Sequence, residues 1–133
     1  MDTSSRAVVV SLSRDSPELL ELCRSLGIDI VRHFVQVRAS PDPRTFVGPG
    51  KLKEIAGFIT EEDVGLCIFD GELEASTSFN VENALGCSVF DRVRLILEIF
   101  QRQASSEEAR LQVEAAMLVH ELPLLKEWVH RAK

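Results

Sequence analysis

The sequence predicts an α/β fold: a four-stranded parallel sheet with helices on both faces, followed by a long C-terminal helix. Short runs of β-branched and other apolar residues alternate along the chain with stretches of helical periodicity. Single helices between strands imply right-handed crossovers, which leave the strands parallel and place helices on both faces of the sheet. Residues 105–133 differ, because they keep one helical pattern and no strand signal follows it.

The individual elements follow from local signals. The first strand is predicted at residues 7–10, an Ala-Val-Val-Val run typical of a buried strand. The next helix has Pro17 in its first turn and ends at Gly27, which matches the preferences of the two helix termini. The remaining predicted elements are a strand at 28–37, a helix around 52–59, a strand at 66–69, a helix at 75–85, a strand at 88–90 and a helix at 92–103.

The last helix carries two apolar stripes. Ser105 and Glu108 form a capping-box pattern at its start, and Pro123, which should kink it, is its one interruption before Arg131. A second stripe contains Met117, Leu124 and Trp128. The first stripe is a seam with heptad spacing, made of Leu111, Ala115, Leu118, Leu122, Leu125 and Val129.

These stripes suggest a division of the chain into an α/β domain at 1–104 and a helical arm at 105–133. A long helix with two apolar stripes favours half of an antiparallel helix pair whose other half lies elsewhere. The alternative is a helix that folds back on its own domain.

Composition excludes several classes of protein. The net charge of −6 argues against a basic, nonspecific nucleic-acid coat protein. No stretch approaches the roughly 20 apolar residues of a membrane-spanning helix, and the N-terminus lacks the pattern of a signal peptide. Three cysteines without C-x-x-C spacing predict reduced, mostly buried thiols and hence a cytoplasmic protein.

A glycine turn at Gly48, Gly50 and Lys51 is the one candidate anion site. A P-loop would need Gly at position 45 and Ser or Thr at position 52, but the chain has Thr45 and Leu52 there. Backbone N–H groups at a helix start beside a lysine can still hold an anion. The alternative is a tight connection between a strand and a helix.

Other chemical motifs are incomplete. Asp70 follows a strand as in phosphorelay receiver domains, but the other acidic residues and the lysine of such domains are missing. The segment 86–90 is a near miss for a nucleophile elbow, with Phe90 where Gly is required. The three histidines lack metal-ligand spacing, and Asp91 is expected to cap the helix at 92–103. We therefore predict no catalytic residue, no metal site and no enzyme activity for this chain alone.

The segment 41–54, Pro-Asp-Pro-Arg-Thr-Phe-Val-Gly-Pro-Gly-Lys-Leu-Lys-Glu, resembles the P-x-x-[YF]-[IV]-G-x-G-K-x-x-E signature of HflX-type GTPases. The resemblance extends from about residue 6 to 128. Val93 stands where the family usually has Thr, residues 76–78 where it has Ser-Pro-Gln, and Ala109-Arg110 where it has Gly-Lys, although Arg110 keeps the charge. Further family residues occur in the expected order, namely Asp70, Asn80, Glu82, Asp91, Arg92, Gln112 and Glu114.

This resemblance implies an N-terminal part of a larger GTP-binding protein. HflX-type proteins have an α/β domain, a long antiparallel helix pair and a G domain that binds GTP with Mg²⁺, and they associate with the large ribosomal subunit. This chain would hold the first domain and the first long helix, while the second helix and the G-domain motifs are absent from it. The expected contacts with ribosomal RNA are Arg110, Lys126, Arg131 and Lys133.

Two other interpretations stay open. The chain could be a stand-alone nucleotide-binding module whose site lies at the carboxyl ends of the strands, lined by Asp70, Asp91 and the turn at 48–51. It could also be an adaptor that forms a homodimer through the helix at 106–131. Neither interpretation involves a membrane.

Overall fold

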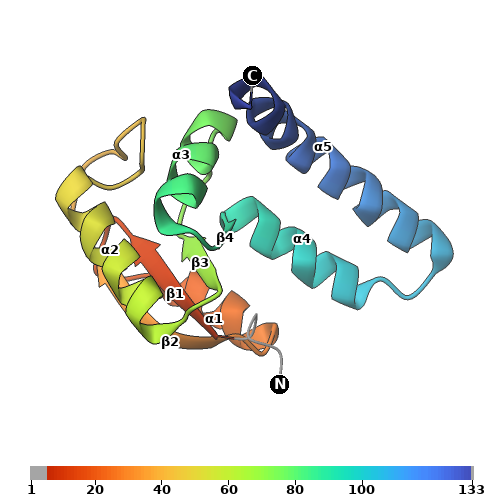
Figure 1. Ribbon diagram of the computed structural model, residues 1–133. Coiled ribbons are helices and arrows are strands. Elements are labelled where there is room, and N and C mark those ends of the chain that lie inside the picture. Colours follow the sequence, from red (N-terminus) through yellow and green to blue (C-terminus); the bar gives the residue numbers. More distant parts are fainter. Residues whose placement is uncertain (1–5, 133) are drawn as a thin grey trace.

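The computed structural model describes residues 6–132 and confirms the α/β fold. All the predicted strands and helices are present, and the strand predicted at 28–37 is a little shorter than expected (Figure 1). The elements are β1 (Arg6–Ser11), α1 (Pro17–Ser25), β2 (Asp29–Val35), α2 (Pro49–Glu62), β3 (Leu66–Phe69), α3 (Ala75–Leu85), β4 (Ser88–Phe90), α4 (Arg92–Gln103) and α5 (Glu107–Arg131).

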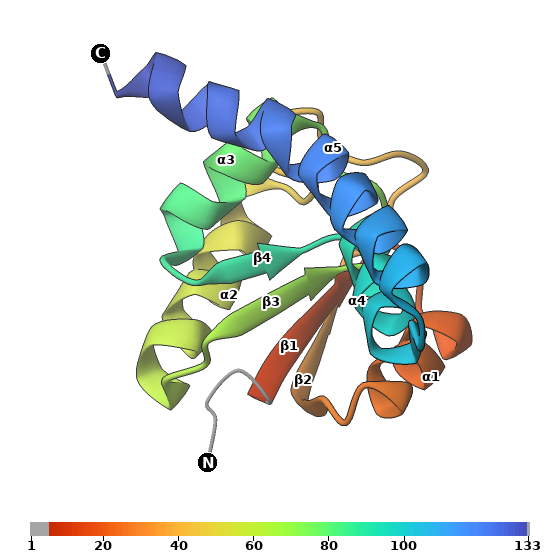
Figure 2. The same cartoon turned by 90° about the vertical axis from the view of Figure 1, so that its right-hand side faces the viewer.

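The four strands form one parallel sheet in the order β2-β1-β3-β4 (Figure 2). From β1 the chain moves outward to β2 and then crosses back over β1 to reach β3. The direction of winding therefore changes between β1 and β3, whose carboxyl ends are the usual place for ligands in such sheets. The short strand β4 forms one edge of the sheet, and β2 forms the other.

Side chains alternate between the two faces of the sheet and build two apolar cores. Val8 and Val10 of β1 face α2 and α3, whereas Ala7 and Val9 face α1 and α4. These four residues have no exposed surface, as the β-branched run predicted. The first core also contains Phe34, Phe46, Val47, Ile55, Ile59, Val64, Cys67, Phe69, Val81 and Leu85, and the second contains Leu19, Cys23, Leu66, Ile68 and Leu95.

Helix termini largely follow the predicted signals. Gly27 has a φ of +72° just after α1, a left-handed conformation that glycine adopts without steric cost. The capping box predicted for Ser105 and Glu108 is wrong by one residue. Ser106 is the N-cap of α5, and its side chain accepts a hydrogen bond from the Ala109 N–H at 3.1 Å.

The long helix α5 folds back over α3 and α4, as both views show, and continues through Pro123 (Figures 1 and 2). Its second stripe makes this contact: Met117 is buried, and the Trp128 ring lies 4.4 Å from the Phe79 ring of α3, centroid to centroid. The large members of the seam are exposed, including 67% of Leu118 and 51% of Leu122. The fold-back alternative is therefore correct for one stripe, while the other has no partner among residues 6–132.

Candidate functional site

Asp91 joins three parts of the molecule through one buried carboxylate. Its Oδ1 accepts a hydrogen bond from the Arg94 N–H at 2.9 Å, which confirms the predicted N-cap of α4. Its Oδ2 accepts from the Leu73 N–H at 3.0 Å, and His120 Nε2 of α5 lies 3.2 Å from Oδ1. A salt bridge at 2.7 Å between Arg94 and Glu121 lies beside this cluster. Asp91 therefore ties the start of α4 and the loop before α3 to the middle of α5.

Arg92 connects the carboxyl end of β3 with the first turn of α1. Its Nη1 lies 3.1 Å from Asp70 Oδ1, and its Nη2 pairs with the Glu18 carboxylate. The hydrogen bond to Glu18 is the main reason why the pKa of Arg92 is raised above its ordinary value. Asp70 and Arg92, both predicted from the family resemblance, thus meet at the point where the winding of the sheet changes.

The loop before α2 is held in a tight conformation. Asp42 and Phe46 exchange backbone hydrogen bonds of 3.0 and 2.8 Å, and Phe46 has a φ of +68°, which is unusual for an aromatic residue. The Arg44 N–H donates to Asp42 Oδ1 at 2.8 Å and is the main cause of the lowered pKa of Asp42. The Phe46 ring packs edge-on against Phe69, with 5.2 Å between the centroids. A β-carbon at Gly71 would lie 2.9 Å from the Phe46 ring, so this glycine leaves room for it.

Two side chains of helix α3 donate hydrogen bonds to the same loop. Thr77 Oγ1 donates to the Pro43 carbonyl at 2.7 Å, and Asn80 Nδ2 donates to the Arg44 carbonyl at 2.9 Å. The Oδ1 atom of Asn80 accepts a hydrogen bond from the Arg131 guanidinium of α5 at 3.3 Å. Asn80 therefore links the loop before α2 to the end of the long helix α5. The sequence did not reveal this role.

The glycine turn is already engaged within the chain. The Gly48 N–H donates to Gln36 Oε1 at 2.8 Å, Pro49 has no N–H to offer, and Lys51 Nζ pairs with Glu54 at 3.1 Å. Among the hydrogen bonds and ion pairs of residues 6–132, none joins this turn to Asp70 or Asp91. The Gly48 N–H and the Lys51 ammonium group are therefore already paired within the chain.

Ser11 and His33 form a pair that the sequence did not suggest. Ser11 Oγ lies 2.7 Å from His33 Nε2 and donates its proton to the Ser13 carbonyl at 2.8 Å. Because the hydroxyl proton is used in that bond, the imidazole acts as the donor to Ser11 and cannot serve as its base. This pair therefore stabilises the ends of β1 and β2 and does not form a nucleophilic site.

The cysteines and acidic residues offer no reactive centre in the described part of the chain. Cys23 and Cys67 are buried free thiols, and Cys87 is half-buried, in line with the prediction from their spacing. Burial raises the pKa of Cys23 and of Cys87 to about 11 and that of Cys67 well above its ordinary value, so thiolates are scarce at neutral pH. No group of three His, Cys, Asp or Glu residues within 6–132 is placed to hold a metal ion.

The predicted RNA contacts on α5 differ in their surroundings. Arg131 is engaged within the fold, since it pairs with Glu127 at 2.8 Å and its guanidinium lies 4.5 Å from the centre of the Phe79 ring. Arg110 and Lys126 are exposed on the helix surface. Gln112 and Glu114, predicted from the family pattern, are exposed as well, and Lys133 lies outside the described residues.

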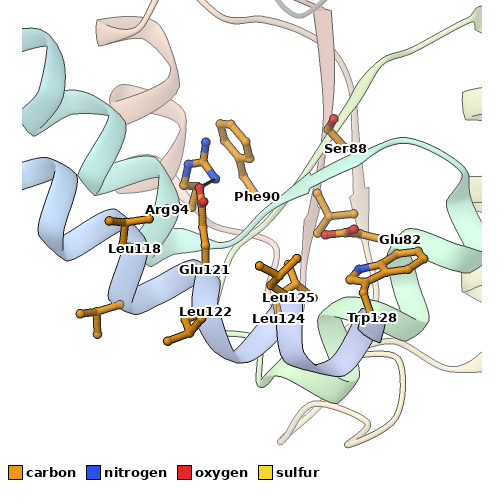
Figure 3. A pocket seen from close by; sticks show the side chains of 12 residues that line it. Glu82, Ser88, Phe90, Arg94, Leu118, Glu121, Leu122, Leu124, Leu125 and Trp128 are labelled. Carbon is orange, nitrogen blue, oxygen red and sulfur yellow. Dashed lines mark hydrogen bonds and ion pairs between the residues drawn. The ribbon is translucent and has the colours of Figure 1, made fainter. Parts of the chain in front are cut away.

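A groove of about 660 Å³ separates α5 from the outer edge of β4 (Figure 3). Glu82 and Trp128 lie side by side at one end, and Arg94 and Glu121 lie toward the other. Burial raises the pKa of the Glu82 carboxyl, and hydrogen bonding with Trp128 and Ser78 partly offsets this effect. The groove is lined by Glu82, Ser88, Val89, Phe90, Arg94, Leu118, Val119, Glu121, Leu122, Leu124, Leu125 and Trp128.

No helix within residues 6–132 combines the length and the apolar character needed to cross a membrane.

Comparison with known proteins points to one family. Residues 13–101 match the family described as GTP-binding GTPase N-terminal. The chain is 38% identical over 114 residues to the GTPase HflX of Flavobacterium psychrophilum, and 34% identical over 137 residues to that of Escherichia coli. These matches cover 85% and 97% of this chain, but the chain spans 28% and 32% of the lengths of those relatives.

Solved structures show the same similarity. The complex of the protein called SsGBP with GDP superposes with a TM-score of 0.80 at 27% identity, covering 96% of this chain and 38% of that one. A GTP-binding protein of Sulfolobus solfataricus in complex with GDP gives a TM-score of 0.76 at 27% identity, covering 94% and 39% of the two chains.

Proposed function

This chain belongs to the GTP-binding GTPase N-terminal family and is a domain of the HflX type, and from this premise we propose that it is the ribosome-facing N-terminal part of a GTP-binding protein. The chain matches only 28% and 32% of the lengths of the two relatives quoted above. The proposal places a second long helix and a G domain in the remaining length. A ribosome-associated protein of this kind would act in the cytoplasm.

The exposed seam of α5 is the observation that carries this proposal. Leu111, Leu118, Leu122, Leu125 and Val129 are each more than half exposed on one side of a helix of 25 residues. Monomeric proteins seldom leave so continuous an apolar strip in water, and heptad spacing suits a second helix. We expect this helix to complete an antiparallel pair with α5.

In this proposal the α/β domain acts by positioning. Contacts of Asp91 with His120, of Arg94 with Glu121 and of Phe79 with Trp128 fix α5 against α3 and α4. A helix held in this way carries its exposed cations to fixed places on a partner. Arg110 and Lys126 would then contact phosphates of ribosomal RNA, and Arg131 would keep the end of the helix in place.

Residues 45–52 do not match a P-loop that would hold GTP and Mg²⁺. Thr45 and Leu52 occupy positions where a P-loop needs Gly and Ser or Thr, and Lys51 is paired with Glu54. A separate nucleotide site at the strand ends is also disfavoured, because the cation there, Arg92, is already held by Asp70 and Glu18. GTP binding and hydrolysis are therefore proposed for the G domain of the larger protein.

The test compares two reversals of charge in the larger protein. Lys126→Glu should weaken binding to large ribosomal subunits and reduce the salt dependence of that binding, because a phosphate contact is lost. Lys53→Glu makes the same change in charge on the exposed surface of α2 and should have little effect. Equal effects of the two variants, or none from Lys126→Glu, would contradict the contact at Lys126.

A further inference from the structure

The outer edge of β4 is an open template for another strand. Within residues 6–132, β4 pairs with β3 alone. The N–H groups of Ser88 and Arg92 donate inward, to the carbonyls of Gly65 at 3.1 Å and Gly71 at 3.0 Å. Because alternate residues of a strand turn to opposite edges, the N–H and C=O of Val89 face outward. An extended peptide can use such groups to extend the sheet.

The groove beside this edge is large enough to hold a ligand. Its volume of about 660 Å³ lies within the usual range of ligand sites, roughly 300 to 1,000 Å³. Val89 and Phe90 of β4 belong to its lining. Figure 3 shows Phe90 on one side and leucines of α5 on the opposite side. An extended segment paired with this edge would direct its side chains toward the two faces of the sheet, one covered by α3 and the other by α4.

The charges in the groove are unevenly compensated. At one end Arg94 pairs with Glu98 at 2.9 Å and with Glu121 at 2.7 Å. At the other end Glu82 is half-buried, and in the part of the chain that the structure describes no cation lies within ion-pair distance of it. The ring of Trp128 lies beside its carboxylate (Figure 3). A carboxylate next to an aromatic ring is a suitable receptor for an ammonium or guanidinium group.

We propose that the groove binds an extended peptide segment that pairs with Val89 as an added strand and places a lysine or arginine side chain against Glu82 and Trp128. This inference goes beyond the ribosome proposal, although the two share one wall of the groove. Leu118, Leu122 and Leu125 belong to both the seam and the groove, so the test relies on Glu82 and Val89, which the seam does not contain.

Trp128 is the single tryptophan of the chain, so its fluorescence reports directly on the groove. The probes are blocked octapeptides of alternating valine and threonine with one central lysine, or with glutamate at that place. The lysine peptide should bind the 133-residue chain about ten-fold more tightly than the glutamate peptide. Glu82→Gln should remove this preference, whereas Glu114→Gln, an exposed position of α5 outside the groove, should retain it.

A second variant tests the backbone pairing. Val89→Pro removes the outward N–H, and proline is tolerated on edge strands, so peptide binding should fall about ten-fold without a large change in melting temperature. If this variant does not fold, a lysine peptide with proline in place of its central valines should bind the native chain about ten-fold less tightly. Equal affinities for the lysine and glutamate peptides, or no fluorescence change at millimolar peptide, would overturn the proposal. Tighter binding of a helical peptide of equal charge would also overturn it, because the occupant would then be a helix.

Discussion

At the scale of single residues, Asp91 shows how one side chain can join several segments. One side chain caps α4, satisfies the Leu73 amide and contacts His120. A buried carboxylate that accepts several hydrogen bonds leaves several unsatisfied groups when it is removed. The sequence predicted the cap because Asp is a preferred N-cap residue before a helical stretch. It could not predict the other two contacts, which come from segments 18 and 29 residues away.

Asp91→Ala should lower the free energy of unfolding by about 2–4 kcal/mol, from a lost cap and an orphaned buried amide. Asp91→Asn should lower the free energy of unfolding by less. The single amide oxygen of asparagine can still cap α4, but it cannot also accept the hydrogen bond from the Leu73 N–H. Denaturant titration of the three proteins measures the differences. A loss below about 0.5 kcal/mol for the alanine variant would contradict this role.

Glu82 should give the chain a distinctive dependence of stability on pH. The pKa of Glu82 in the folded state lies above its ordinary value of 4.5. At a pH between the ordinary pKa and the raised pKa, the folded chain therefore binds more protons than the unfolded chain. The contribution of Glu82 to stability therefore falls as pH rises through this window. Glu82→Gln should become more stable relative to the native chain as pH increases from 4.5 to neutrality, as measured by thermal unfolding. Glu114→Gln, the same substitution at an exposed position of α5, is the matched control.

At the scale of elements, periodicity and turn residues predicted most of the helices and strands. The helices at 75–85 and 92–103 have the predicted bounds, because Gly86 and Asp91 mark their termini with distinct chemistry. The predicted N-cap of α5, Ser105, was wrong by one residue. Two successive serines offer equivalent caps, so the sequence pattern did not distinguish Ser105 from Ser106.

The groove could not be predicted from the sequence for a different reason. Its lining comes from α3, β4, α4 and α5, and these segments meet through the fold-back of α5. The apolar residues of α5 showed two stripes but not which stripe would pack on the domain. That choice depends on complementary partners such as Phe79, which a pattern in one helix does not contain.

Trp128 should hold the last turns of α5 on α3. Trp128→Ala should lower the free energy of unfolding by about 1–3 kcal/mol, less than for a fully buried aromatic residue because 39% of its surface is exposed. Hydrogen exchange should accelerate in the last turns of α5 and remain slow in β1 and β3. Trp128→Phe keeps a ring against Phe79 and should show a smaller change. Uniform acceleration across the sheet would contradict a local role.

At the scale of the whole molecule, the seam on α5 leaves a long apolar surface exposed among residues 6–132. If nothing covers it, we expect copies of the 133-residue chain to associate through it at concentrations around 100 μM, which sedimentation can detect. Leu118→Gln combined with Leu122→Gln should keep the chain monomeric. Both positions are more than half exposed, so the unfolding free energy should change by less than about 0.5 kcal/mol. A wild-type chain that stays monomeric would argue against the homodimer.

The position of α5 over the short strand β4 also bears on how this protein would fail under stress. An open sheet edge is a site where folded molecules join into aggregates. Because α5 crosses that edge and is attached mainly at α3 and α4, it can loosen while the central strands remain folded. Conditions that release the helix would then precipitate a chain whose sheet is intact. We therefore expect aggregation of this protein to follow release of its last helix more closely than unfolding of its core.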